Sequence, residues 1–96
     1  MNEYIVTANK IGFIKEESTE DQRTFHIAGA GMATYKDLMI RLLDLWGDKK
    51  IKIDNEGHVS GCQIFLNGRI MRNLNVPLNF NLTAVDITFV RAMSGG

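Results

Sequence analysis

Two internal groups of residues and one end of this 96-residue chain are of types that could do chemistry. Cys62, the single cysteine, offers a thiol that could carry a persulfide. Asp54, Glu56 and His58 lie within KIDNEGH at 52–58 and are of metal-ligand types. The sequence ends in RAMSGG, and a chance Gly-Gly ending has a likelihood of about 0.5% at average glycine usage.

Cys62 and the KIDNEGH segment have simpler structural interpretations. A reactive cysteine needs an electropositive, partly exposed setting, and no sequence feature indicates one, so we interpret Cys62 as a small buried residue on a core-facing strand. Polar residues around a glycine-containing turn need no metal to explain them, and the calcium-loop spacing is absent. His26 and His58 are 32 residues apart without a ligand motif. We therefore expect no metal site.

The composition and motifs argue against catalysis and against nucleic-acid binding. The sequence has no phosphate-binding loop, nucleophile elbow or zinc-hydrolase motif, and GAG at 29–31 lacks the third glycine and the βαβ context of a dinucleotide site. Eleven basic residues balance eleven acidic residues, whereas phosphate neutralisation needs a basic excess. We expect a protein that performs no catalysis itself and binds no cofactor and no nucleic acid.

Length and hydropathy predict one domain with a single core. The first residues, MNEYIVTANKIGF, lack the basic and apolar regions of a signal peptide. No apolar run is long enough to span a bilayer, and a single cysteine excludes an intrachain disulfide. We expect a cytoplasmic protein that does not act at a membrane.

The clearest local pattern is a helix in TYKDLMIRLLDLWGDK at 34–49. Thr34 is the expected N-cap, with Asp37 three residues later, and Gly47 the expected C-cap. Ile40 falls outside the apolar stripe and is expected to be exposed. The stripe has helical spacing and consists of Tyr35, Leu38, Met39, Leu42, Leu43 and Trp46.

The other apolar segments predict strands. YIVTANKIGFIKEES at 4–18 and RTFHIAG at 23–29 form a predicted hairpin, with the acidic KEESTED at 15–21 as its solvated loop. CQIFLNGRIM at 62–71 predicts a second hairpin around Asn67-Gly68, the preferred pair of a type I′ turn. AVDITFVRA at 84–92 alternates like a half-buried strand.

The alternation in these last strands predicts an exposed apolar surface. Around an Asn67-Gly68 turn, Phe65 lies opposite Ile70, and the two side chains share the face away from the core. Val90 falls on the outer face of the last strand. We predict that Phe65, Ile70 and Val90 form a partner-docking surface; the alternatives are cover by loops, or a register shifted by one residue, which would exchange the faces.

The predicted order is ββαβββ, an α+β fold in which one mixed sheet covers one helix. With LNGR at 66–69, PL at 77–78 and a last strand that leads to Gly95-Gly96, the chain resembles the ubiquitin-like β-grasp sulfur carriers. It is most similar to the molybdopterin synthase small subunit and the thiamine-biosynthesis sulfur carrier. The resemblance implies a β-grasp domain over 1–91 and a flexible tail over 92–96.

The resemblance also implies a function centred on Gly96. A ubiquitin-activating-enzyme-like adenylyltransferase would use ATP to adenylate the Gly96 carboxylate, and sulfur from a persulfide donor would displace AMP to leave a thiocarboxylate. An acceptor enzyme, such as a synthase large subunit, would take the sulfur into a cofactor precursor of molybdopterin, tungstopterin or thiamine synthesis. The tail that enters the partner's active site would be Arg91, Ala92, Met93, Ser94 and Gly95.

Several alternatives remain open at this point. The same adenylated glycine could be attacked by a lysine amine, which would make the chain a covalent protein modifier. The domain could instead be a non-covalent interaction module with an incidental, frayed Gly-Gly end. NFNLTAVD stands where many family members have an Asp-Gly-Asp-like turn, and RAM stands where prolines often precede the glycines. These departures leave the pathway open, together with the role of residues 12–23.

Overall fold

A computed structural model describes residues 3–12, 22–79 and 81–91. The predicted acidic loop at 15–21 and the tail at 92–96 lie outside the described residues. The described part contains one helix and seven strands, in the order β1 (Glu3–Ile11), β2 (Gln22–Ala28), α1 (Tyr35–Trp46), β3 (Lys52–Ile53), β4 (Val59–Ser60), β5 (Gln63–Leu66), β6 (Arg69–Met71) and β7 (Ala84–Val90).

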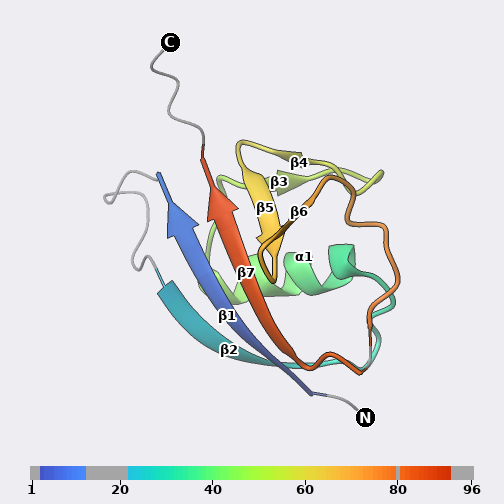
Figure 1. Cartoon of the computed structure of the whole chain (residues 1–96). Helices are drawn as coiled ribbons and strands as arrows, with labels where there is room; N and C mark the ends of the chain where they lie inside the picture. Colours follow the sequence, from blue (N-terminus) through green and yellow to red (C-terminus); the bar gives the residue numbers. More distant parts are fainter. Residues whose placement is uncertain (1–2, 13–21, 80, 92–96) are drawn as a thin grey trace.

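The main sheet has five strands in the order β2-β1-β7-β5-β6, and α1 packs against one of its faces. β1 and β7 run parallel in the middle of the sheet, whereas β1 pairs with β2 and β5 pairs with β6 and β7 in antiparallel fashion. Figure 1 shows β1 and β7 side by side, with their carboxyl ends at the same edge of the sheet. This arrangement confirms the predicted α+β fold, a β-grasp.

The helix begins and ends at the predicted caps. The Thr34 side chain accepts a hydrogen bond from the Asp37 N–H while the Asp37 carboxylate accepts from the Thr34 N–H, which completes a capping box. Gly47 ends the helix in the left-handed conformation with φ 78°. All six residues of the predicted apolar stripe are buried, and Ile40 is 48% exposed, as predicted.

The core lies between α1 and the inner face of the sheet. Phe25 of β2 and Phe89 of β7 both contact the Trp46 ring edge-on, with centroids 5.6 and 6.1 Å apart respectively. Inward and outward side chains alternate along β1, β2 and β7, and the inward ones are buried. This aromatic cluster joins α1 to β2 at the edge of the sheet and to β7 at its centre.

The β5–β6 hairpin has the predicted turn and register. Asn67 and Gly68 both have positive φ, 49° and 83°, as a type I′ turn requires. Ile64 pairs with Met71, and Phe65 pairs with Ile70. The Asn67 side-chain oxygen also accepts the Asp86 N–H at 2.8 Å, which ties the turn to β7.

The structure adds features that the sequence pattern does not indicate. The KIDNEGH turn is framed by a separate two-stranded sheet of β3 and β4. Pro77 lies outside the strands and makes a single bridge to Thr34. Leu74 and Leu78 beside it are buried in the core. Within the described ranges, no helix has the length and apolarity that crossing a membrane requires.

Candidate functional site

The predicted tail follows the central strand of the sheet. Arg91, the last described residue, donates its N–H to the carbonyl oxygen of Ile11 at 2.9 Å, so β1 and β7 stay paired to the end. The other predicted tail residues, Ala92 to Gly96, lie outside the described residues, and their roles stay predictions. The described part of the site is therefore the base of the tail.

Gly12 packs directly on this base. Its φ is +83°, and a Cβ built on it would lie 2.5 Å from the Arg91 carbonyl oxygen. Real Cβ atoms essentially never come so close, so a larger residue at position 12 would displace the Arg91 backbone. The end of β1 thus fixes where the chain leaves β7.

A buried ion pair lies beneath the end of β1. Lys10 Nζ is 2.5 Å from Asp48 Oδ2, and the two side chains are only 3% and 4% exposed. The ammonium also lies 4.2 Å from the centroid of the Trp46 ring. Burial would raise the pKa of Asp48, but hydrogen bonds from Lys10 and from the N–H groups of Ile51 and Lys50 outweigh it, so the pKa is lowered. Asp48 is ionised at neutral pH.

Cys62 precedes β5 and is partly buried against the core. Burial, aided by the nearby Asp48 carboxylate, raises the pKa of the thiol to about 11, although Arg91 and Lys10 act in the opposite direction. The thiol is therefore protonated at neutral pH and is a poor nucleophile. This agrees with the interpretation of Cys62 as a small packing residue, although it lies just before the strand rather than on it.

The three residues of the predicted docking surface all lie on the sheet face away from α1. Phe65 stands between Ile70 on β6 and Thr88 on β7, while Val90 pairs with Gln63, one row nearer the tail. Ile70 is 38% exposed, and Phe65 and Val90 are half-buried. The structure places these residues on one face; their role in docking stays a prediction.

Ile11 extends this outer face and was missed by the sequence analysis. It is 55% exposed and pairs with Val90 across the parallel β1–β7 ladder. The alternation along residues 4–11 could have placed it on the outer face. Its position beside Val90 depends on the pairing of the first and last strands, which alternation alone does not give.

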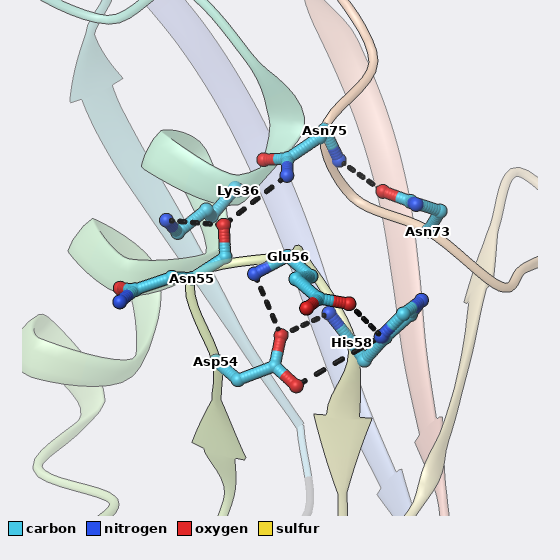
Figure 2. Close-up of polar contacts among 7 residues, drawn as sticks. All are labelled: Lys36, Asp54, Asn55, Glu56, His58, Asn73 and Asn75. Atoms are coloured by element: carbon cyan, nitrogen blue, oxygen red, sulfur yellow. Dashed lines mark hydrogen bonds and ion pairs between the residues drawn. The ribbon is translucent and has the colours of Figure 1, made fainter.

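The second cluster of charged residues lies in the turn between β3 and β4 (Figure 2). Asp54 Oδ1 accepts the N–H groups of Glu56 and His58, each at 2.9 Å. The hydrogen bonds from these two backbone groups, that of His58 foremost, hold the pKa of Asp54 below its ordinary value. The imidazole Nδ1 of His58 lies 3.8 Å from Asp54 Oδ2 and also 3.8 Å from Glu56 Oε2.

Polar contacts from two other segments hold this turn in place. Lys36 of α1 and Asn75 both donate to the Asn55 carbonyl oxygen, at 3.4 and 3.3 Å (Figure 2). A Cβ at Gly57 would lie 2.8 Å from both Asn73 Oδ1 and the Asn75 nitrogen. These contacts give the polar residues of the turn structural partners. Among the described residues, no three His, Cys, Asp or Glu side chains are grouped as a metal site requires.

The fold and the base of the tail define the class of this chain as a β-grasp domain with its carboxyl-terminal segment leaving a central strand. No protein-family model and no curated protein matches the sequence. Among solved structures, the solution structure of the Haloferax volcanii HVO 2177 protein is similar, with a TM-score of 0.64 and 13% sequence identity. The alignment covers 99% of this chain and 89% of that one. At this identity the likeness concerns the fold.

Proposed function

We propose that this protein is a sulfur carrier whose Gly96 carboxylate is activated and converted to a thiocarboxylate for cofactor biosynthesis. The observation that carries the proposal is the position of β7: it is a central strand, and Gly96 follows Arg91 by five residues. Five residues of extended chain reach roughly 16–18 Å. A partner can therefore bind Gly96 in an enclosed site while the folded domain stays outside.

The proposed reaction converts the Gly96 carboxylate to a thiocarboxylate through an acyl adenylate and an acyl disulfide. The Gly96 carboxylate attacks the α-phosphate of ATP, which releases pyrophosphate and forms an acyl adenylate. The terminal sulfur of a partner's persulfide attacks the acyl carbon and displaces AMP, which forms an acyl disulfide. A second thiol of the partner then cleaves the sulfur–sulfur bond, is itself oxidised to a disulfide, and leaves the thiocarboxylate on Gly96. An acceptor enzyme takes this sulfur, with molybdopterin or tungstopterin synthesis the preferred route and thiamine synthesis the next.

The surroundings of the tail support a partner-driven reaction. The thiol of Cys62, with its pKa of about 11, is protonated at neutral pH and does not suit the role of sulfur donor. The persulfide is therefore assigned to a partner. Gly95 and Gly96 lack side chains, which allows close backbone approach in the partner's site. Two exposed apolar residues, Ile11 beside β7 and Ile70 on β6, offer a surface for the same partner.

The test is the intact mass of the protein purified untagged from its native host. A carrier contains a population heavier by one oxygen-to-sulfur exchange that maps to Gly96, and the same measurement identifies Gly96 as the terminal residue. Incubation with ATP, the host adenylyltransferase and a persulfide donor should increase this population. A protein that stays unmodified under these conditions contradicts the proposal.

Two variants separate this proposal from its alternatives. Removal of Gly95 and Gly96, or addition of one residue after Gly96, should abolish sulfur loading while thermal unfolding stays unchanged. Cys62→Ser is the matched control and should load normally. An isopeptide-linked adduct without a thiocarboxylate would instead indicate a covalent modifier, and full activity of the extended chain would indicate a non-covalent module.

A further inference from the structure

A cavity of about 300 Å³ opens where β4, β5 and β6 meet. Its apolar lining includes Ile64, which is fully buried, and the partly buried Met71. Its polar lining includes Arg72, Gln63 and His58. A pocket lined by both polar and apolar side chains suits the insertion of one polar-tipped side chain.

The cavity lies close to the base of the tail. Met71, the last residue of β6, pairs with Ile64 on β5, and Ile64 pairs in turn with Phe89 on β7. Arg72 directly follows Met71, on the side of this row where Gln63 pairs with Val90. Adjacent strands are about 4.8 Å apart, so the backbone of Met71 lies roughly 10 Å from that of Phe89, and Arg72 and Val90 are the residues that follow them. A protein that encloses the residues after Arg91 would therefore also cover this cavity.

The charge of the cavity is dominated by Arg72. The imidazole of His58 faces the Asp54 and Glu56 carboxylates, each at 3.8 Å, so its positive charge, when present, is already balanced. Arg72 is exposed and has no hydrogen bond or ion pair to any residue in the described ranges. A guanidinium is suited to bind a carboxylate through two parallel hydrogen bonds.

We propose that a partner protein inserts an Asp or Glu side chain into this cavity and pairs it with Arg72. The inference rests on the proposed function, because the partner is the enzyme that adenylates Gly96. The aliphatic part of the inserted side chain contacts Met71, and its carboxylate binds the Arg72 guanidinium. The one arginine that lines the cavity fits one carboxylate rather than a polyanion, and the zero net charge of the chain agrees with a protein partner.

The experiment compares charge reversals at Arg69, the first residue of β6, and at Arg72, which directly follows this strand. Arg72→Glu inverts the proposed contact. Arg69→Glu is the matched control: Arg69 is exposed, has no partner in the described part of the chain, and lies beside the Asn67-Gly68 turn at the far end of β6. Each substitution changes the net charge from 0 to −2. Pyrophosphate release by the purified host adenylyltransferase is measured while each chain is titrated at saturating ATP.

Arg72→Glu should raise the KM for the chain roughly tenfold and leave kcat unchanged, because it opposes like charges at a docking contact. Arg69→Glu should leave both parameters unchanged, and Arg72→Lys, which retains the charge, should have a smaller effect than Arg72→Glu. The difference in KM between Arg72→Glu and the unmodified chain should shrink at high salt. Equal thermal unfolding temperatures verify that the variants are folded. If Arg72→Glu does not fold, Arg72→Gln replaces it, and a smaller rise in KM is then expected.

The outcomes distinguish the two proposals. An unmodified chain that supports no pyrophosphate release overturns the proposed function and this inference with it. If the unmodified chain is adenylated but Arg72→Glu and Arg69→Glu have the same KM, the inference about the cavity alone is wrong. A fall in kcat with an unchanged KM also overturns it, because docking then does not depend on Arg72.

Discussion

Two aspartates of this protein accept backbone hydrogen bonds in similar local turns but in opposite environments. Asp48 accepts the N–H groups of Lys50 and Ile51 through Oδ1, and Asp54 accepts those of Glu56 and His58 through its own Oδ1. The Asp48 side chain is 4% exposed beside the base of the tail, whereas that of Asp54 is 58% exposed in the β3–β4 turn. The sequence around each aspartate therefore specifies the turn, and the fold decides what else the carboxylate does.

The difference in burial changes what the basic partner contributes. Lys10 is in direct contact with Asp48 in the interior, where an unpaired charge would be poorly solvated. The imidazole of His58 lies 3.8 Å from Asp54 in solvent, where such pairs contribute little. We therefore expect the buried pair to stabilise the fold near the tail, and the exposed pair to shape only its own turn.

The largest effect should come from Lys10→Met, which leaves the Asp48 carboxylate buried without its ammonium partner. We expect a loss of about 3–5 kcal/mol in the free energy of unfolding, measured by urea denaturation at neutral pH. The double variant Lys10→Met, Asp48→Asn removes both charges and should recover part of this loss. A loss from Lys10→Met below about 1 kcal/mol, the value of an exposed pair, would show that water reaches the site.

The pH dependence of this buried pair can be tested separately with Asp48→Asn. Folding lowers the pKa of Asp48, so its ionised form adds stability above the unfolded-state pKa, and this contribution is lost as the pH falls through the lower folded-state pKa. The stability difference between the unmodified chain and Asp48→Asn should therefore be full at neutral pH and shrink in acid. A difference that is constant across this range would contradict the assignment.

The next effect concerns the glycine that packs on the base of the tail. Gly12 and Gly31 both have φ +83°, but a Cβ at Gly31 has nothing within 4 Å, whereas one at Gly12 meets the Arg91 carbonyl oxygen. Gly31→Ala should cost about 1 kcal/mol for its backbone conformation alone. Gly12→Ala should cost about 1–2 kcal/mol more, as measured by thermal unfolding. Equal losses of stability for Gly12→Ala and Gly31→Ala would mean that the ends of β1 and β7 can move apart at no cost when a Cβ is added at position 12.

The predictable parts of the fold were those with local patterns. The stripe of α1 between Thr34 and Gly47 repeats over three turns and carries both caps, so its position and its buried face follow from spacing. The Asn67-Gly68 turn fixes the register of its hairpin because its two residues accept positive φ. Each of these two signals comes from residues that are close together in the sequence, and tertiary contacts reinforce both.

The parts that escaped prediction depend on long-range pairing. Lys10 occupies an inward position of β1, and its partner Asp48 lies 38 residues away. The contact of Gly12 with Arg91 exists only because the first and last strands are parallel neighbours. β3 and β4 have two residues each, which is too few to show a pattern of alternation in the sequence. The cavity beside Arg72 likewise forms only when β4 and the β5–β6 hairpin meet.

The smallest effect should come from Asp54→Asn, the exposed counterpart of Asp48→Asn. The amide oxygen of Asn can still accept the N–H groups of Glu56 and His58, so the turn should persist and the loss in stability should be less than that of Asp48→Asn. Folding lowers the pKa of Asp54. The small difference in unfolding free energy between the unmodified chain and Asp54→Asn should therefore exist above the unfolded-state pKa and vanish as the pH falls through the folded-state pKa. Salt should reduce it, because the carboxylate is exposed. Urea denaturation of both variants at low and high salt tests this order. If Asp54→Asn and Asp48→Asn lose the same free energy of unfolding, burial beside the tail does not determine how much each aspartate contributes.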